Sequence, residues 1–251
     1  MMKLSVSKIN TFLEDPRKYW YVYEMGIKTP KSEGYFFGSA VHEGLENYYN
    51  KKDPMQGVSR ALFGKKSSIG EEAKEGVDPH KLYTQARKIF DVYASKAPKF
   101  NPLFVEHRFE VDLIHPQTGE QLQATFTGKV DLITVEGDVV DHKTGGNFGS
   151  HYFDEPNWVQ STGYAYFYWV KFGKLPRSVI FNQISRNKVT TFEKKTMNPD
   201  LKDLCKFVDI CKDVLGKISR GETKDYPSEK HYRVCPCKDI CPYCQKRGEQ
   251  P

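Results

Sequence analysis

The chain has 251 residues, of which 38% are hydrophobic, and it carries a formal net charge of +6. This length and composition suffice to bury one sizeable core, with or without a small appendage, as in ordinary globular proteins. No apolar run approaches the ~20 residues that span a bilayer, and the apolar stretch at the N-terminus is too short for a secretory signal. We therefore expect a cytoplasmic protein without a membrane partner.

Positive charge is concentrated in the C-terminal third of the chain. Residues 171–251 carry 18 basic and 10 acidic side chains, whereas residues 1–170 carry 20 basic and 22 acidic ones. A cationic surface attracts polyanions by counterion release and electrostatic steering, so nucleic acid is the natural partner. A lysine-rich surface without a partner is the alternative, because charge alone does not distinguish the two.

The first predicted elements are two short helices within residues 5–24. Their apolar residues have helical spacing, and Pro16 begins the second helix. This second helix mixes basic and aromatic residues, which suits single-stranded DNA because rings stack on bases and cations meet phosphates. The candidates for DNA contact are Arg17, Lys18 and Tyr19. The alternative is a set of core aromatic residues flanked by surface cations.

Residues 36–50 predict a helix packed against a sheet, because apolar residues recur at every fourth position. His42 lies beside this apolar stripe, although a lone histidine is more often structural than a metal ligand. Residues 54–78 are polar and glycine-rich, and we expect them to form a mobile insertion. A further helix is predicted at about residues 79–96.

Three antiparallel strands are expected next. Residues 104–114 alternate between apolar and polar side chains, and a turn at residues 116–119 leads into a strand that contains Gly128–Ile133. Turn residues at 136–138 then connect this strand to Val139–Thr144.

The hairpin formed by the last two strands carries the main chemical signal. Asp141 and Lys143 project from one face and His142 from the other, and Asp131 is expected almost opposite residues 142 and 143. Two nearby carboxylates call for a cation, and oxygen ligands favour Mg²⁺ or Mn²⁺. Lys143 could orient or deprotonate a water molecule beside such an ion. The alternative is a solvated hairpin with ordinary surface charges.

The following segment, residues 154–172, predicts an amphipathic helix with Gln160 and Tyr164 one turn apart. Their neutral amide and phenol could bind phosphate or a base. The alternative is that Tyr164 is one of the packed aromatic residues of this helix. Residues 177–185 and 188–195 predict a hairpin. A helix at about residues 199–219 places Cys205 and Cys211 on its apolar stripe, as buried core residues.

Four further cysteines lie within ten residues near the C-terminus. They are Cys235, Cys237, Cys241 and Cys244. In a reducing compartment this density indicates a metal–thiolate site rather than disulfides. Sulfur ligands select zinc or an iron–sulfur cluster, and the residues alone leave both open.

Taken in order, these motifs resemble the RecB-like branch of the PD-(D/E)XK nuclease superfamily, in particular CRISPR-associated RecB-like exonucleases and phage relatives. The matching segments are SVSKINTFLEDPRKYWY, GSAVHEGLE, GKVDLI, VVDHKTG, QSTGY and the cysteine-rich tail. The resemblance covers nearly all of residues 5–245. It implies an α/β fold with a restriction-endonuclease-like core, in which helices flank a mixed central sheet.

The resemblance also implies roles for individual residues. His42, Asp131, Asp141 and the backbone carbonyl of His142 would be metal ligands, and Lys143 would be the catalytic lysine. Gln160 and Tyr164 would face DNA or support the site. On this basis we expect a nuclease domain at residues 1–225, with the insertion at 54–78, and a metal-binding tail at residues 226–251.

The tail departs from the family pattern. Iron–sulfur members carry a cysteine immediately before the proline of the N-terminal motif, where this chain has Asp15 before Pro16. The tail has a fourth cysteine of its own instead. One compact loop of four cysteines suits a single tetrahedral ion, so we favour zinc over an iron–sulfur cluster.

We therefore expect an Mg²⁺- or Mn²⁺-dependent DNA exonuclease that acts on single-stranded or frayed ends in a bacterial, archaeal or phage-infected cell. A helicase or recombination protein is a possible partner. One alternative is a DNA-binding subunit of a recombination, integration or helicase complex that keeps the nuclease fold. Another is a structure-selective endonuclease.

Overall fold

The computed structural model describes residues 1–28, 30–65, 67, 69, 76–145, 155–186, 189–224, 226–238 and 240–248. Its strands are β1 Met2–Leu4, β2 Pro102–Ile114, β3 Gln121–Thr134, β4 Asp138–Gly145, β5 Ser178–Ser185 and β6 Phe192–Met197. Its helices are α1 Val6–Glu14, α2 Pro16–Tyr19, the π-helix η1 Trp20–Glu24, α3 Glu33–Tyr49, α4 Pro54–Phe63, α6 Pro79–Lys96, α7 Glu155–Phe172, α8 Leu201–Ser219, α9 His231–Val234 and α10 Pro242–Gly248. Within the described residues no helix is long and apolar enough to cross a membrane.

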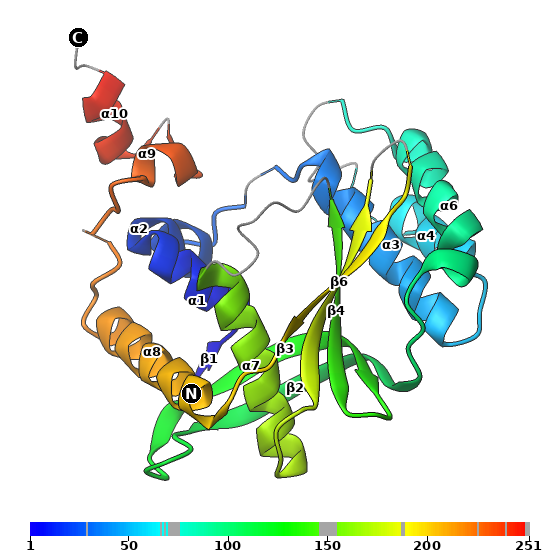
Figure 1. Ribbon diagram of the computed structural model, residues 1–251. Coiled ribbons are helices and arrows are strands. Elements are labelled where there is room, and N and C mark those ends of the chain that lie inside the picture. The colour runs from blue at the N-terminus through cyan, green and yellow to red at the C-terminus, as the bar shows by residue number, and fades with distance from the viewer. Residues whose placement is uncertain are drawn as a thin grey trace.

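A mixed six-stranded sheet forms the centre of the molecule (Figure 1). The strand order is β1-β3-β4-β5-β6, and β2 pairs with β3 beside this path. β1 is parallel to β3 and β4 is parallel to β5, whereas the remaining pairs are antiparallel. Helices α1, α7 and α8 share one apolar core with the sheet, and α3, α4 and α6 form a second one. The predicted mixed α/β fold with flanking helices is confirmed.

The β3–β4 hairpin differs slightly in register from the prediction. Leu132 pairs with Val140 and Ile133 with Val139. Continuing this register by one residue places Asp131 opposite Asp141, rather than opposite residues 142 and 143. The turn is tight, because the N–H of Gly137, which has a φ of 87°, donates to the carbonyl of Thr134. The register of the hairpin is therefore shifted from the predicted one.

The predicted mobile insertion is wrong for its first ten residues, which form helix α4. The Asp53 side chain caps this helix, and Val58 and Leu62 are buried in the core shared with α3 and α6. Gly57 permits this packing, since a Cβ there would lie 2.2 Å from the carbonyl oxygen of Glu43. The glycine that suggested a loop thus allows two helices to approach closely.

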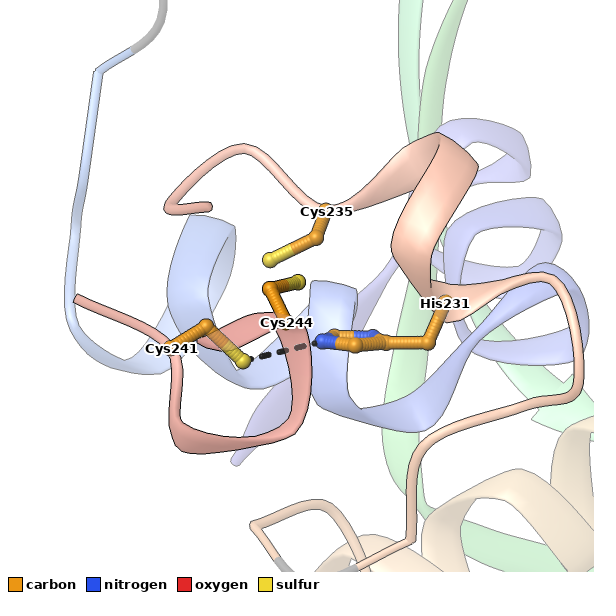
Figure 2. Close-up of side chains that lie close together, drawn as sticks. All are labelled: His231, Cys235, Cys241 and Cys244. Atoms are coloured by element: carbon orange, nitrogen blue, oxygen red, sulfur yellow. Dashed lines mark hydrogen bonds between the residues drawn. The ribbon is translucent and has the colours of Figure 1, made fainter. Parts of the chain in front are cut away.

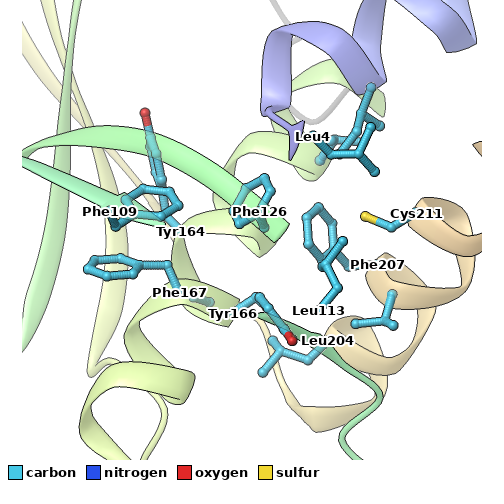
Figure 3. Close-up of a cluster of buried hydrophobic side chains, with 14 of the residues drawn as sticks. Leu4, Phe109, Leu113, Phe126, Tyr164, Tyr166, Phe167, Leu204, Phe207 and Cys211 are labelled. Carbon is cyan, nitrogen blue, oxygen red and sulfur yellow. The ribbon is translucent and has the colours of Figure 1, made fainter. Parts of the chain in front are cut away.

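The largest core contains a group of aromatic side chains between the sheet and helices α7 and α8 (Figure 3). Phe126 of β3 is fully buried, with its ring centroid 5.1 Å from that of Phe207 and 5.3 Å from that of Phe109. Gly163 of α7 faces these rings. A Cβ at this position would lie 2.9 Å from Cζ of Phe126.

This close approach leads to a stability prediction. Gly163→Val should lower the free energy of unfolding by about 1–3 kcal/mol, because the added atoms overpack a rigid core. Gly34→Val is the matched control, since a Cβ there meets only the Ser32 hydroxyl at 3.7 Å. Urea unfolding followed by circular dichroism measures both variants. Equal stability of the two would contradict the packing described for α7.

Candidate functional site

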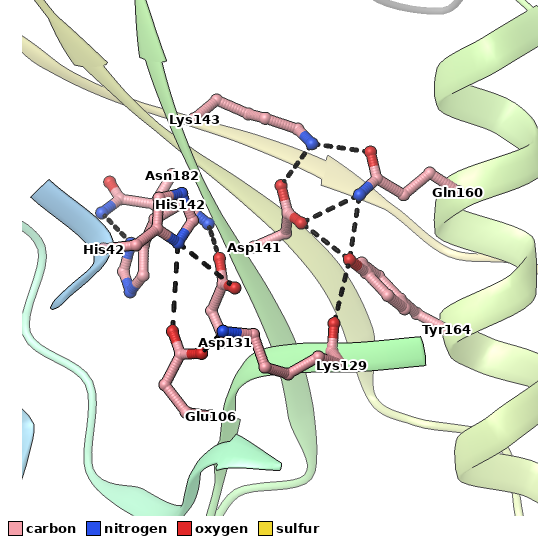
Figure 4. Close-up of polar contacts among 10 residues, drawn as sticks. All are labelled: His42, Glu106, Lys129, Asp131, Asp141, His142, Lys143, Gln160, Tyr164 and Asn182. Atoms are coloured by element: carbon pink, nitrogen blue, oxygen red, sulfur yellow. Dashed lines mark hydrogen bonds and ion pairs between the residues drawn. The ribbon is translucent and has the colours of Figure 1, made fainter. Parts of the chain in front are cut away.

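Three potential metal ligands lie together where α3 meets the sheet (Figure 4). They are His42 of α3, Glu106 of β2 and Asp131 of β3. Nδ1 of His42 lies 3.4 Å from Oδ1 of Asp131 and 3.9 Å from Oε1 of Glu106. The ligand atoms of all three residues lie within 4.8 Å of one another, so one ion could contact them all. The structure thus brings His42, which the sequence alone left ambiguous, next to one of the predicted carboxylates.

Glu106 is a site residue that the sequence analysis missed. The alternation of its strand placed it on the polar face, as an ordinary surface residue. Its φ of 52° lies in the left-handed region, which residues other than glycine rarely adopt. Its side chain is only 10% exposed and forms ion pairs with His42 and Lys129. Such backbone strain occurs often at functional sites, but no local sequence pattern marks it.

The charges of these residues determine their protonation. Burial opposes protonation of His42, but the carboxylates of Asp131 and Glu106 outweigh it and raise the pKa of His42 to about 10. Burial likewise opposes ionisation of Asp131, yet the His42 imidazolium holds the pKa of Asp131 well below its usual value. The imidazolium thus compensates the buried negative charge. A divalent cation bound by these side chains would give the same compensation, so the donor set fits a metal ion.

Asp141 lies outside this group of three and faces helix α7 instead (Figure 4). Its Oδ2 is 2.7 Å from Nζ of Lys143. Its Oδ1 accepts hydrogen bonds from Nε2 of Gln160 at 3.0 Å and from the hydroxyl of Tyr164 at 2.9 Å. Lys143 also donates to Oε1 of Gln160 at 2.6 Å. The two chemically suggestive pairs of the sequence therefore form one hydrogen-bonded network.

Burial dominates the electrostatics of this network. It raises the pKa of Asp141, and repulsion from Asp131 adds to the effect, while Lys143 opposes it. Burial and the neighbouring carboxylates also raise the pKa of Tyr164 well above its usual value, so Tyr164 remains a neutral donor. A carboxyl whose ionisation is opposed by burial and by a second carboxylate would be stabilised by added positive charge. A metal ion bound beside Asp141 would therefore stabilise its ionised carboxylate.

His142 connects the two halves of the site through its backbone. Its N–H donates to Oδ2 of Asp131 at 2.7 Å. Its ring points away from Lys143, stacks on Tyr49 with centroids 5.7 Å apart, and has Nδ1 2.9 Å from Nδ2 of Asn182. Burial lowers the pKa of His142 to about 4, so the ring is neutral. The ring thus packs β4 against α3, and the carbonyl remains a predicted ligand.

The predicted DNA-contacting residues near the N-terminus are mostly buried. Arg17 is 6% exposed and stacks over the ring of Trp20 at 4.3 Å, and it also donates to the carbonyl of Lys224. Tyr19 is 4% exposed and lies in the core. Lys18 is partly exposed and pairs with a neighbouring glutamate. Core packing therefore explains Arg17 and Tyr19, and DNA could reach them only if this packing opened.

The tail places three of its four cysteines around a histidine. Cys235, Cys241 and Cys244 lie with His231 in a group whose ligand atoms are all within 4.8 Å. All four cysteines are buried, and none is in a disulfide. Cys237, which was predicted to be the fourth ligand, lies outside this group, and His231 was not predicted at all.

The comparisons with known proteins identify the family of the chain. The family model of the PD-(D/E)XK nuclease superfamily matches residues 3–242. The chain belongs to this superfamily. PD-(D/E)XK nucleases use divalent metal ions to cleave DNA, and the buried acidic groups around His42 are possible ligands for one. No curated protein matches the chain.

The solved structures that resemble this chain differ strongly from it in sequence. A protein from Eubacterium rectale, described as "Putative exonuclease", has a TM-score of 0.61 at 13% identity and covers 99% of this chain and 88% of its own. A protein described as SSO0001 has a TM-score of 0.39 at 12% identity and covers 94% and 95%, respectively. The first likeness shows a shared fold, and the second is too weak to compare folds.

Proposed function

We propose that the protein is a metal-dependent deoxyribonuclease of the RecB-like branch that hydrolyses phosphodiester bonds at single-stranded or frayed DNA ends. The observation that carries this proposal is that Asp131 and Asp141 lie on the adjacent strands β3 and β4, each paired with a basic side chain. His42 contacts Asp131 at 3.4 Å on one side, and Lys143 contacts Asp141 at 2.7 Å on the other. Membership of the PD-(D/E)XK superfamily supports the same chemistry.

Mg²⁺ or Mn²⁺ would be held by His42, Asp131, Asp141 and the carbonyl of His142, and Glu106 offers a further carboxylate. When bound, such an ion supplies Lewis-acid chemistry, which polarises a phosphoryl oxygen and lowers the pKa of water. The buried, largely oxygen-based donor set is the feature of this chain that favours these hard cations.

The remaining residues position the reacting groups. The Lys143 ammonium can orient the attacking water and stabilise the negative charge that develops on the phosphate. Gln160 and Tyr164 hold Asp141 and Lys143 through three hydrogen bonds, and a fourth joins Gln160 to Tyr164. Their neutral donors can also bind phosphate or a base without adding charge. Of the three candidates Arg17, Lys18 and Tyr19, Lys18 is the most exposed for contact with DNA.

Several observations favour DNA ends as the substrate. The motifs resemble RecB-like exonucleases, and a structural neighbour is described as an exonuclease. The excess of basic residues in positions 171–251 suits a polyanion. If duplex DNA must first be unwound, a separate helicase or recombination protein would provide that step, in the cytoplasm of a bacterial, archaeal or phage-infected cell.

The test compares DNA substrates at equal concentration. Purified protein with Mn²⁺ or Mg²⁺ should degrade end-labelled single-stranded and frayed linear DNA and leave a closed circle of the same sequence intact. EDTA should abolish the reaction, because the ion is required. Gel analysis of the labelled products measures both results.

Three other outcomes of this cleavage test would change or contradict the proposed function. Cleavage of the closed circle would replace the exonuclease with an endonuclease. Metal-dependent DNA binding without cleavage of any substrate would show a non-catalytic subunit of a larger complex. Neither binding nor cleavage on any DNA would contradict the proposed function as a whole.

A further inference from the structure

The tail of the chain contains a compact group of metal-binding side chains (Figure 2). His231 begins α9, Cys235 follows that helix, and Cys241 and Cys244 lie at the start of α10. Their exposed fractions are between 0% and 6%. Nε2 of His231 lies 3.2 Å from Sγ of Cys241. One nitrogen and three sulfurs thus face a common point.

The other nitrogen of His231 is held by a buried carboxylate. Nδ1 of His231 lies 3.0 Å from Oδ1 of Asp15, which is fully buried at the start of α2. Oδ2 of Asp15 accepts hydrogen bonds from the N–H of Ser228 at 2.8 Å and from its hydroxyl at 2.7 Å. A carboxylate on Nδ1 fixes the proton there and leaves the Nε2 lone pair facing the sulfurs.

We propose that Nε2 of His231 and the sulfurs of Cys235, Cys241 and Cys244 bind one Zn²⁺, and that Asp15 is the positioning residue for His231. Three cysteines and one histidine form a frequent tetrahedral set for structural zinc. A carboxylate that receives the second nitrogen of a ligating histidine is the usual partner at such sites. This ligand set replaces Cys237, of the predicted four-cysteine site, with His231.

The position of Cys237 is consistent with a supporting role. Its backbone N–H points to Sγ of Cys235 at 3.4 Å, and its carbonyl accepts hydrogen bonds from the N–H groups of Ile240 and Cys241. The residue therefore shapes the loop that presents the other sulfurs. Hydrogen bonds to a sulfur stabilise its thiolate form, which is the form that binds zinc.

The zinc site would also attach the tail to the N-terminal helices. Asp15 joins residues 228 and 231 to the start of α2, and the neighbouring Arg17 contacts the carbonyl of Lys224 and lies 5.4 Å from the ring of Tyr243. The cysteines pack against Tyr21 and the adjacent Trp20. Ligation free energy at such a site is largely folding free energy, so zinc would hold the tail in place.

The metal itself is tested on the wild-type protein. After purification without chelator or air, elemental analysis should find one zinc per chain in a colourless protein. Replacement by Co²⁺ should give the visible spectrum of a tetrahedral site with three sulfurs and one nitrogen. A brown protein with iron, a four-sulfur cobalt spectrum, or no bound metal would each overturn the proposal.

Variants then separate the ligands. Cys237→Ser should retain one zinc per chain, whereas His231→Ala and Cys241→Ser should lose it. Zinc lost from Cys237→Ser but retained by His231→Ala would establish the four-cysteine site instead. If the ligand variants fail to fold, Cys237→Ser and the wild-type cobalt spectrum still decide between the two sites.

The role of Asp15 has its own matched pair of variants. Asp15→Asn should weaken zinc binding by about 10–100-fold, as removal of such partners does elsewhere. Ser228→Ala removes a contact to the same carboxylate but leaves His231 untouched, so its zinc affinity should be unchanged. A chelator competition assay measures both. Equal affinities, with both proteins folded by circular dichroism, would contradict the positioning role.

Discussion

Asp131→Asn should reduce metal-dependent DNA cleavage by at least about 100-fold, as loss of one group that stabilises the transition state does in other enzymes. The substitution removes the negative charge that pairs with His42 and that would bind the metal. The remaining side-chain oxygen can still accept the N–H of His142, which now donates to Asp131 at 2.7 Å. The hairpin should therefore fold normally while its affinity for Mn²⁺ falls.

Initial rates on end-labelled DNA and calorimetric titration with Mn²⁺ measure the two effects. Asp112→Asn is the matched control, because it makes the same change at an exposed position on the neighbouring strand β2. Its rate should stay within about twofold of wild type, as surface substitutions usually do little. Full activity of Asp131→Asn would show that Asp131 is not a ligand of the proposed catalytic metal.

Lys143→Ala should also lower the cleavage rate, by about 10²–10³-fold, the range for loss of one group that stabilises developing negative charge. In contrast to Asp131→Asn, the Lys143→Ala variant should bind Mn²⁺ at least as tightly as wild type. Lys143 is not a ligand, and its ammonium now neutralises Asp141 at 2.7 Å. Its removal leaves Gln160 and Tyr164 to hold that carboxylate.

Lys3→Ala is the control for this change, since Lys3 forms an exposed ion pair with Glu110 on the surface. It should cleave DNA at the wild-type rate. The same two measurements apply, namely initial rate and Mn²⁺ affinity. If Lys143→Ala lost metal binding together with activity, Lys143 would be a structural element of the metal site and not the catalytic lysine.

The local chemistry of the site could be predicted from the chain. The alternation of β4 places Asp141 and Lys143 on one face, and a single turn of α7 separates Gln160 from Tyr164. These periodicities are fixed by backbone geometry, so two residues on one element keep their relationship in any fold. The structure adds that the two pairs meet at the carboxylate of Asp141.

Residues that reach the site from distant elements were harder to predict. Glu106 has a left-handed backbone conformation inside a strand, and its carboxylate is paired with His42 of helix α3. His231 joins the tail cluster because Asp15, more than 200 residues earlier, holds its ring. Helix α4 forms because Gly57 lets it approach α3. Each depends on a partner that is remote in the sequence.

The sequence by itself determined the type of fold, the position of most helices and strands, and the side chains that could carry acid, base and metal chemistry. Hydrophobic periodicity and residue type are local properties that suffice for the elements and the candidate side chains, whereas the type of fold was inferred from the resemblance of the motifs to a known family. Only the tertiary structure decided which potential ligands lie together, that Glu106 and His231 are among them, and that Arg17 and Tyr19 are buried. Those outcomes follow from packing and from the pairing of buried charges, whose free energy depends on neighbours brought together by the whole fold.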